Sequence, residues 1–373
     1  MEFPEISPTN QKEITCKGCS AGLQFKPGTR HLQCPYCGME QEIAASVEQV
    51  RELDLLGMLG KVEDSADTYE VVTVNCDACN ARTTFSPGVV ADACPFCGKH
   101  MTVTKSTSNR IIKPASLLPF KILRSEADSG YQQWLKSLWF APGDLQQFAR
   151  REGRLSGMYI PYWTYDADTV SKYHGERGDD YDETETYTTV ENGNQVTKTR
   201  TVTKTRWHSV SGRVREFFND ILILAGASLP KKYADRLAPW DLENLVPFDD
   251  KFLTGFSTES YQITLREGFQ EAKSIMEDEI HQLVCRDIGG DHQRVQSINT
   301  RYHDLTFKHI LLPVWISAYR YRNTVYRMLI NARTGEVQGE RPYSWIKITL
   351  FILACVALVA GAIEWYDYYQ TRR

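Results

Sequence analysis

The chain carries the stretch Cys16-Lys17-Gly18-Cys19 followed by Cys34-Pro35-Tyr36-Cys37-Gly38, and this frame decides the fold of its N-terminal part. The same frame returns sixty positions later, as Cys76-Asp77-Ala78-Cys79 followed by Cys94-Pro95-Phe96-Cys97-Gly98. Fourteen residues separate the two cysteine pairs in each copy. The interior repeats as well, with Phe25, Pro27 and Gly28 in the first copy and Phe85, Pro87 and Gly88 in the second.

Each frame has the spacing of a four-thiolate metal site. Two residues between paired cysteines let both thiolates of a tight turn face one ion, while Pro35 and Pro95 preset the turns. Gly38 and Gly98 supply the positive φ that ends each turn. Four thiolates at about 2.3 Å close a tetrahedral shell around zinc and leave no vacant position. The frames therefore predict two structural zinc ribbons, with one zinc ion in each.

The expected ligands are Cys16, Cys19, Cys34 and Cys37 in the first ribbon and Cys76, Cys79, Cys94 and Cys97 in the second. Disulfides are one alternative, but Met1–Thr15 does not read as a signal peptide, and paired CxxC turns inside a larger chain favour metal. Iron is the other alternative, because rubredoxin-type sites hold it with the same four thiolates. The sequence leaves that choice open.

The second landmark is an apolar run at the other end of the chain. Ile348 to Ile363 contains no charged residue, and Trp345 and Trp365 flank it. As a helix, Trp345–Trp365 is about 31 Å long, which matches a bilayer core with interfacial aromatic residues at both ends. We expect one membrane span at residues 345–365. Because zinc thiolates favour a reducing compartment, we expect the bulk of the chain in the cytosol and only a short tail beyond the membrane.

Composition argues against a nucleic-acid-binding protein. The net charge is −4, and neither cysteine frame has a strong basic face. Binding to DNA or RNA by a membrane-tethered ribbon protein is therefore the runner-up interpretation. Between the ribbons, Ser46 and Gln49 resemble a capping box, and an apolar stripe from Val47 to Leu56 predicts a short helix that ends before Gly57.

Residues 111–344 show landmarks that occur twice in the same order. Leu117-Leu118-Pro119-Phe120 precedes a helical stripe at Tyr131, Trp134, Leu135 and Leu138, and then Tyr159–Trp163. Leu245-Val246-Pro247-Phe248 precedes a longer stripe at Leu265, Phe269, Ala272, Met276, Ile280 and Leu283, and then Leu311–Trp315. These two passes predict two related α+β units that pack through their sheets.

A long hairpin is expected within the first unit. Asn192-Gly193 is a strong two-residue turn signal, and it sets Asp179 opposite Arg206 and Glu185 opposite Arg200. One face then pairs threonines, namely Thr184 with Thr201, Thr186 with Thr199 and Thr188 with Thr197. Because neither face is apolar, we expect a solvated arm at residues 179–206 that offers strand edges to a partner.

Catalytic motifs are absent from the sequence. It has no GxxxxGK[ST] phosphate loop, HExxH helix or GxSxG elbow. The densest titratable cluster is Asp287, Asp291, His292, His303, Asp304 and His309, whose spacing fits no metal pattern. We expect a polar loop there and a protein that is not an enzyme, with a zinc-dependent hydrolase as a remote alternative.

Together these motifs resemble a known bacterial group. The ribbons, Pro161-Tyr162-Trp163, Leu311–Trp315, Asp287–Asp291, the Gly339–Ser344 junction and the C-terminal span look like membrane-anchored double-zinc-ribbon proteins. Automated transfer often labels that group as relatives of the primosomal helicase. The resemblance implies an inner-membrane adaptor or scaffold that associates with phage-shock protein A and SPFH-domain, virion-core-like proteins. The cysteine ligands carry over, but no partner-binding residue does.

The sequence thus predicts a multi-domain chain. The expected segments are ribbon 1 at 1–45, a helical and acidic linker at 46–70, ribbon 2 at 71–104, an α+β unit at 105–240, a second unit at 241–344, the span at 345–365 and a tail at 366–373.

Overall fold

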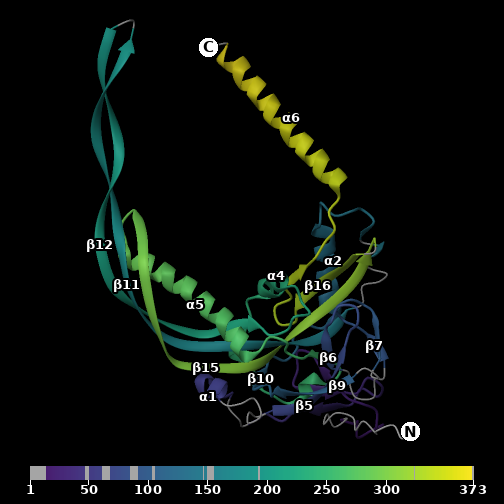
Figure 1. Ribbon diagram of the computed structural model, residues 1–373. Helices are drawn as coiled ribbons and strands as arrows, with labels where there is room; N and C mark the ends of the chain where they lie inside the picture. Colours follow the sequence, from purple (N-terminus) through teal and green to yellow (C-terminus); the bar gives the residue numbers. More distant parts are fainter. Residues whose placement is uncertain are drawn as a thin grey trace.

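The computed structural model describes residues 14–46, 50–60, 68–84, 91–102, 106–145, 147–148, 155–191, 194–322 and 324–371. Figure 1 shows a body built on a large sheet, from which a hairpin arm and the C-terminal helix rise on the same side. The turn Asn192-Gly193, the repeated positions Phe85, Pro87 and Gly88, and the capping residue Gln49 lie outside the described residues.

The two ribbons differ in how their strands are used. Ribbon 1 is a separate antiparallel sheet made of β1 (Gln24–Lys26), β2 (His31–Gln33) and β3 (Glu40–Glu42). Ribbon 2 has its own two-stranded sheet, β7 (Ala91–Ala93) with β8 (His100–Thr102). Its remaining strands, β5 (Thr68–Asn75) and β6 (Arg82–Thr84), belong to the large sheet.

The large sheet has twelve strands and mixed directions. Its main path runs β13-β10-β15-β11-β14-β6-β5-β9, and β12, β16, β17 and β4 attach to it. The strands not yet bounded are β4 (Leu53–Asp54), β9 (Ser106–Ile112), β10 (Ser116–Leu117), β11 (Ser156–Glu191), β12 (Asn194–Leu224), β13 (Val246–Pro247), β14 (Ser257–Glu259), β15 (His292–Tyr321), β16 (Thr324–Asn331) and β17 (Val337–Gly339). The sequence therefore folds into two small cysteine-rich units, one large mixed sheet and a C-terminal apolar helix.

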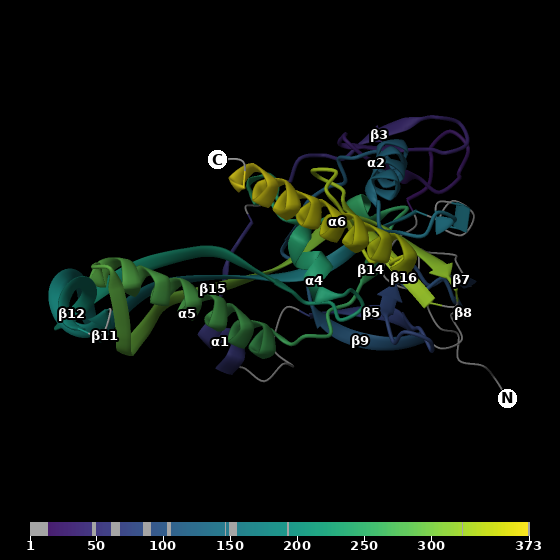
Figure 2. The same cartoon turned by 90° about the horizontal axis from the view of Figure 1, so that it is seen from above.

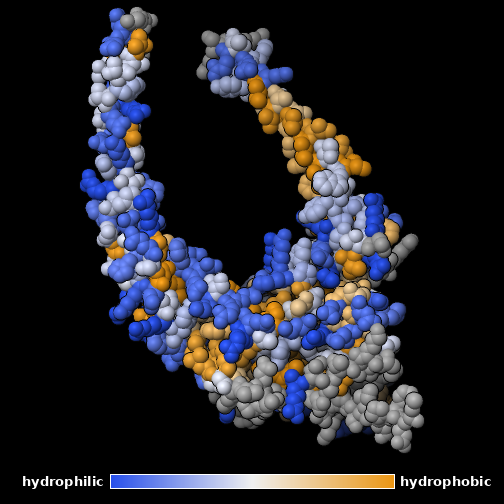
Figure 3. Space-filling model, viewed as in Figure 1, coloured by the Kyte–Doolittle hydropathy of each residue, from blue (hydrophilic) through white to orange (hydrophobic). Residues whose placement is uncertain are grey.

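Strands β11 and β12 form the long hairpin. The observed pairs include Asp179 with Arg206, Glu185 with Arg200 and Tyr187 with Lys198, which are the pairs that the turn predicts. The threonine pairs also occur as expected. Strand β15 pairs with β11 only as far as Gly178 opposite His292, so residues 179–191 and 194–206 form a two-stranded arm. The arm is mostly polar on its surface, with a few small hydrophobic patches, one of them near its tip (Figure 3).

Helix α5 (Leu265–Ile288) packs on one face of β11, β12 and β15 (Figure 2). A capping box starts it, because Thr264 accepts from the Glu267 backbone N–H while Glu267 accepts from that of Thr264. Gly289, with φ of 66°, follows its last residue. The buried face contains Leu265, Gly268, Ala272, Met276, Ile280, Val284 and Ile288, so Val284 takes the place expected for Leu283, which is half-buried.

Helix α2 (Arg124–Ser137) precedes β11 as α5 precedes β15. Corresponding contacts recur around the two helices. The Trp163 indole donates to the Ile263 carbonyl at 3.0 Å, and the Trp315 indole donates to the Ile122 carbonyl at 3.0 Å. Ile122 and Ile263 each lie two residues before the first helical residue, and a glutamate, Glu126 or Glu267, caps each helix.

The two segments that begin the expected passes, at 117–120 and 245–248, lie side by side in the sheet. Leu117 pairs antiparallel with Val246, so the two proline-containing segments pair with each other. The parallel contact of β10 with β15 has its counterpart in β14, which pairs with β11 through Tyr159 and Thr258. Short strands of two or three residues carry too little periodicity to be identified from sequence.

The linker also differs from its expected form. Helix α1 spans Leu55–Gly60, whereas residues 50–52 are irregular and Leu53 lies in β4, opposite Phe307 of β15. The linker therefore contains a short helix, as expected, but the helix begins at Leu55 and not near Ser46, while residues 47–49 lie outside the described residues. The Asp54 carboxylate accepts from the Gly57 backbone N–H at 2.7 Å, so Asp54, and not Ser46, marks the start of the helix.

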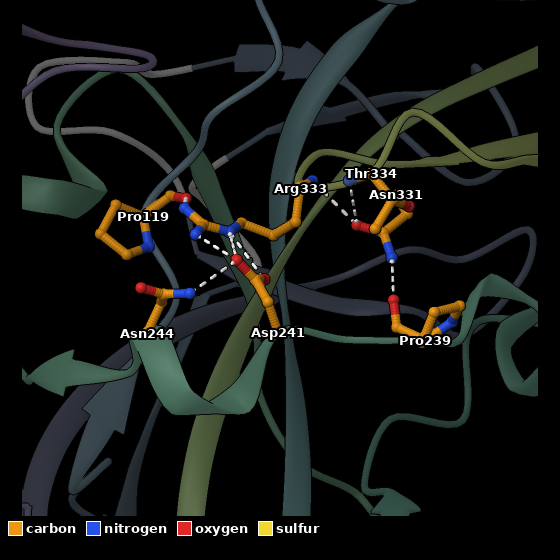
Figure 4. A network of polar contacts seen from close by, with 7 residues as sticks. All are labelled: Pro119, Pro239, Asp241, Asn244, Asn331, Arg333 and Thr334. Atoms are coloured by element: carbon orange, nitrogen blue, oxygen red, sulfur yellow. Dashed lines mark hydrogen bonds and ion pairs between the residues drawn. The ribbon is translucent and has the colours of Figure 1, made fainter.

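Short helical turns connect β12 to α5: α4 (Lys231–Ala234), η3 (Asp235–Leu237), η4 (Leu242–Asn244) and η5 (Asp250–Leu253). Arg333, just after β16, joins this connection to the rest of the body through hydrogen bonds (Figure 4). Its guanidinium donates to both oxygens of Asp241 and to the Pro119 carbonyl. Arg333 therefore joins the segments on either side of the β10–β13 pair.

Helix α6 (Trp345–Gln370) is the one helix among the described residues that is long and apolar enough to cross a membrane. None of its apolar window is buried against the body. It is longer than the expected span, because residues 366–370, predicted as tail, continue the helix to Gln370. Figure 3 shows hydrophobic side chains along the face of α6 that is in view.

Candidate metal centres

The first ribbon brings four sulfur atoms together. Cys16 Sγ lies 3.5 Å from Cys37 Sγ, and Cys19 Sγ lies 3.4 Å from Cys34 Sγ. The turns arise from local hydrogen bonds: Ser20 donates to the Cys16 carbonyl at 2.8 Å. Gly38 donates to that of Cys34 at 3.0 Å and has φ of 74°. This conformation strains any residue with a Cβ, which explains the glycine after the second pair.

The second ribbon repeats this geometry. Cys76 Sγ lies 3.5 Å from Cys97 Sγ, and Cys79 Sγ lies 3.6 Å from Cys94 Sγ. Gly98 donates to the Cys94 carbonyl at 2.8 Å with φ of 73°. The eight predicted ligands thus fall into two groups of four, and in each group the sulfurs all lie within 4.8 Å of one another.

These distances fit a shared ion better than a covalent bond. Sulfurs around a tetrahedral ion with bonds of about 2.3 Å are about 3.8 Å apart. A disulfide would hold two of them at about 2.05 Å, and all ten cysteines are free. Each group could therefore hold one metal ion, and the disulfide alternative is contradicted. Zinc and iron share this donor set, so the geometry does not choose between them.

Backbone amides prepare the first ribbon for thiolates. The Gly18 backbone N–H lies 3.4 Å from Cys16 Sγ, and the backbone N–H groups of Gly18 and Cys19 lower the pKa of the Cys16 thiol. In the same way the backbone N–H of Cys37 lowers the pKa of Cys34 to about 6, whereas the neighbouring thiols raise the pKa of Cys19 and of Cys37. Donors aimed at sulfur favour the charged form that binds metal.

The ribbons flank a common cleft of about 770 Å³. Ribbon 1 enters it with Phe25, whose ring packs 5.2 Å from Phe252 and whose backbone N–H donates to the Thr254 carbonyl at 2.9 Å. Ribbon 2 lines the other side with Cys94 and Pro95. The metal centres are therefore held on the body and not on free tethers.

The titratable residues between 287 and 309 do not form the polar loop expected from the sequence, because most of them lie in strand β15, and they share no site in the described part of the chain. The three histidines lie along the single strand β15, where gaps of eleven and six residues correspond to about 36 and 20 Å of strand. His292 contacts Asp180 at 3.1 Å, whereas His309 is buried beneath Trp163, with ring centroids 4.8 Å apart. Burial lowers the pKa of His309 to about 4. No common site links these groups within the described residues.

Sequence reasoning missed a buried ion cluster around Lys308. Its Nζ lies 2.7 Å from Asp220 Oδ1 and 3.0 Å from Glu52 Oε1, and the side chain is 6% exposed. Burial alone would lower the pKa of Lys308, but the hydrogen bonds that its ammonium donates to Asp220 and Glu52 raise it. The cluster joins the linker to the sheet, and a lysine inside the apolar run Phe307–Leu312 was the available signal.

Comparison with known proteins gives one informative relative. An uncharacterized protein of Bacillus subtilis, YdjG, is 26% identical over 267 residues, which cover 67% of this chain and 73% of YdjG. No family model matches the chain, and no solved structure matches it. The relative's name carries no activity, so the comparison extends the likeness over most of the chain without assigning a function.

Proposed function

We propose that this protein is a membrane-anchored zinc-ribbon scaffold without catalytic activity of its own. Two closed four-cysteine groups, a polar arm and an exposed apolar helix occupy one chain. Four thiolates around one ion leave no position for a substrate, so the metals act as structural staples. The helix then restricts the ribbons and the arm to the surface of a membrane.

The observation that carries this proposal is the contrast between α6 and the body. The helix exposes Leu350, Ile352 and Leu353 to more than half of their full area, although core residues of the body such as Trp163 are fully buried. An exposed apolar helix of this length is stable in lipid and costly in water. Thiolate–zinc sites persist in a reducing compartment, so the proposal places the body in the cytosol and the helix in the bacterial inner membrane.

The proposed partners are protein assemblies at that membrane. The resemblance described above points to phage-shock protein A and SPFH-domain proteins, and hence to envelope stress. Tethering raises the local concentration of a scaffold, so weak contacts with an oligomeric partner would suffice. The arm supports this proposal because its strands at 179–191 and 194–206 pair only with each other among the described residues.

Crosslinking and affinity capture from native membranes would test the scaffold. The full chain is compared with a version truncated before Trp345, and both samples receive nuclease. Recovery of SPFH-type or phage-shock proteins that depends on the anchor would support the proposal. Recovery of the same proteins by the truncated chain from the soluble fraction would refute the role of the membrane.

A second candidate, nucleic-acid binding, has one specific observation in its favour. On the sheet face away from α5, exposed Lys172 lies directly opposite exposed Arg213, and Arg301 is close by on β15. Like charges in direct opposition are unfavourable without an anion. Capture that nuclease abolishes, with affinity that falls steeply as salt rises, would favour this candidate.

We also propose that the body consists of two related α+β units, the first led by β10 and the second by β14. The recurring indole–carbonyl hydrogen bonds of Trp163 and Trp315 support this relation. Trp163→Phe and Trp315→Phe should each lose one buried hydrogen bond, and both should destabilise the protein by about 1–2 kcal/mol. Denaturant titration would measure the pair, and strongly unequal losses would contradict equivalent roles.

A further inference from the structure

The loop after α2 is fastened to the start of α6. The Ser344 backbone N–H donates to the Phe140 carbonyl at 2.7 Å. One turn into the helix, the Lys347 ammonium donates to the Trp139 carbonyl at 3.1 Å and to the Ala141 carbonyl at 2.7 Å. The loop thus supplies two carbonyl oxygens to Lys347, the first charged residue of α6, and it is hydrogen-bonded to that end of the helix.

The same loop presents aromatic side chains at this level. Trp139 is 76% exposed, although tryptophan is among the most hydrophobic side chains to leave in water. The Phe140 ring contacts the Phe351 ring of α6, with centroids 5.4 Å apart. Phe351 follows Trp345 by six residues, which is about 9 Å along a helix. Phe140 therefore reaches past the beginning of the apolar run.

Trp139 belongs to a group of exposed residues suited to a membrane interface. Trp345 is 79% exposed and Tyr343 is 55% exposed at the same end of α6. Tryptophan and tyrosine gather where lipid headgroups meet the acyl chains, and lysine side chains extend from there to water. Exposed Lys136, in the last turn of α2, adds a cation beside the loop.

We propose that the loop Leu138–Ala141 is a second membrane contact, which inserts Trp139 and Phe140 into the interface of the bilayer that α6 enters. This inference rests on the proposed anchoring by α6. A single helix leaves the body free to rotate about the helix axis, whereas a helix and an aromatic loop together define one membrane-facing side. A phospholipid surface suits the loop better than a protein partner, because the hydrogen bond from Ser344 holds the loop next to Trp345, the first residue of the span.

Photocrosslinking of the full chain in phospholipid nanodiscs would test the proposal. The photoreactive residue p-benzoylphenylalanine replaces Trp139 in one variant, Val356 of α6 in a second and Phe217 in a third. Phe217 is the matched control, since it is an aromatic residue of β12 that is 59% exposed. We expect lipid adducts at 139 and 356 and none at 217, as read by mass spectrometry of tryptic peptides.

The other outcomes separate the two proposals. Lipid adducts at 356 without any at 139, or adducts at 139 that contain only protein, would overturn the membrane role of the loop and leave the anchor intact. Absence of lipid adducts at 356 would overturn the anchor and with it the inference.

Fluorescence in the same nanodiscs gives an independent measurement without a large substitution. Phospholipids brominated near the headgroup should quench the part of the emission that Trp139→Phe removes. They should not quench the part removed by Trp207→Phe at the base of the arm, where Trp207 stacks on Arg294 at 3.7 Å. Equal quenching of the two components would contradict the assignment.

Discussion

The two ribbons share one cysteine frame but occupy different environments. In ribbon 1 the outer cysteines Cys19 and Cys37 are exposed, whereas in ribbon 2 the equivalent Cys79 and Cys97 are half-buried. Ribbon 1 completes its own sheet, while two strands of ribbon 2 belong to the large sheet. The aromatic residue between the two cysteines of the second pair shows the contrast most clearly, since Tyr36 is 82% exposed in ribbon 1 and Phe96 is fully buried in ribbon 2.

This contrast teaches that a metal frame fixes local geometry and not its coupling to the rest of the fold. The turns around Gly38 and Gly98 have nearly the same φ and the same hydrogen bond in both ribbons. What differs is the surface against which each frame packs. Loss of the metal should therefore remain more local in ribbon 1 and spread into the large sheet from ribbon 2.

The largest effect should come from removing one ligand of each site. A structural zinc site contributes on the order of 10 kcal/mol, which is comparable with the whole stability of a domain. Cys94→Ser should lose one metal ion per chain and disrupt the pairing of β6 with β14. Cys34→Ser should lose one metal ion and leave the large sheet folded. Metal analysis and mapping of proteolytic cleavage sites would be applied to both variants. If the large sheet resists proteolysis equally in both, the two ribbons do not differ in their coupling to the sheet.

Replacing the equivalent aromatic residues Phe96 and Tyr36 should give the next largest difference in stability. Phe96→Ala leaves a cavity in the core and should cost about 3–5 kcal/mol. Tyr36→Ala removes an exposed ring at the equivalent position and should change stability by less than about 0.5 kcal/mol. Chemical denaturation of the two variants provides the comparison. Similar costs would show that the environment of ribbon 1 includes a surface for Tyr36.

A buried carboxyl beside ribbon 2 should add a pH dependence. Burial raises the pKa of Glu259 to about 7, and Glu259 lies opposite Thr83 of β6. Its contribution to stability is present below the unfolded pKa and is lost as pH rises through about 7. Glu259→Gln should therefore stabilise the protein by about 3 kcal/mol at pH 8 and by about 1 kcal/mol at pH 5. Thermal unfolding at both pH values measures this, and an equal gain at both would contradict the assignment.

The smallest effect should come from the polar ties of each ribbon. The Arg327 Nε donates to the Phe96 carbonyl at 2.9 Å, and Arg327→Leu leaves that carbonyl unpaired at a cost of about 1 kcal/mol. The ion pair of Lys26 with Glu40 in ribbon 1 is about one-third exposed on both sides, so Lys26→Ala should leave the unfolding temperature unchanged. Differential scanning calorimetry would measure the unfolding temperature of both variants. A larger decrease in Lys26→Ala than in Arg327→Leu would contradict the expectation.

The sequence was most informative where a short local pattern determines geometry. The CxxC spacing predicted two four-sulfur groups, and the Asn192-Gly193 signal predicted pairs such as Glu185 with Arg200. Both follow from contacts between residues that are close in the chain. The apolar run predicted a helix of spanning length for the same reason.

Contacts between distant residues were not predictable in this way. Leu53 reads as part of a helical stripe, but the edge of β15 offered it a strand partner at Phe307. The histidines at 292, 303 and 309 read as a cluster, but one continuous strand separates them. The proximity of Trp139 to α6 has no local sequence signal, because it depends on a hydrogen bond between residues 140 and 344.

The shape of the molecule places a condition on the anchor. The arm rises on the same side as α6 and carries ten charged residues between 179 and 206 (Figure 1). Each charge costs about 3 kcal/mol at the centre of a bilayer, so the arm must stay in water. The arm reaches at least as far from the body as α6 does (Figure 1), so the arm and α6 cannot keep this relative orientation when α6 spans a bilayer. A partner that binds the arm would then lie close to the membrane surface.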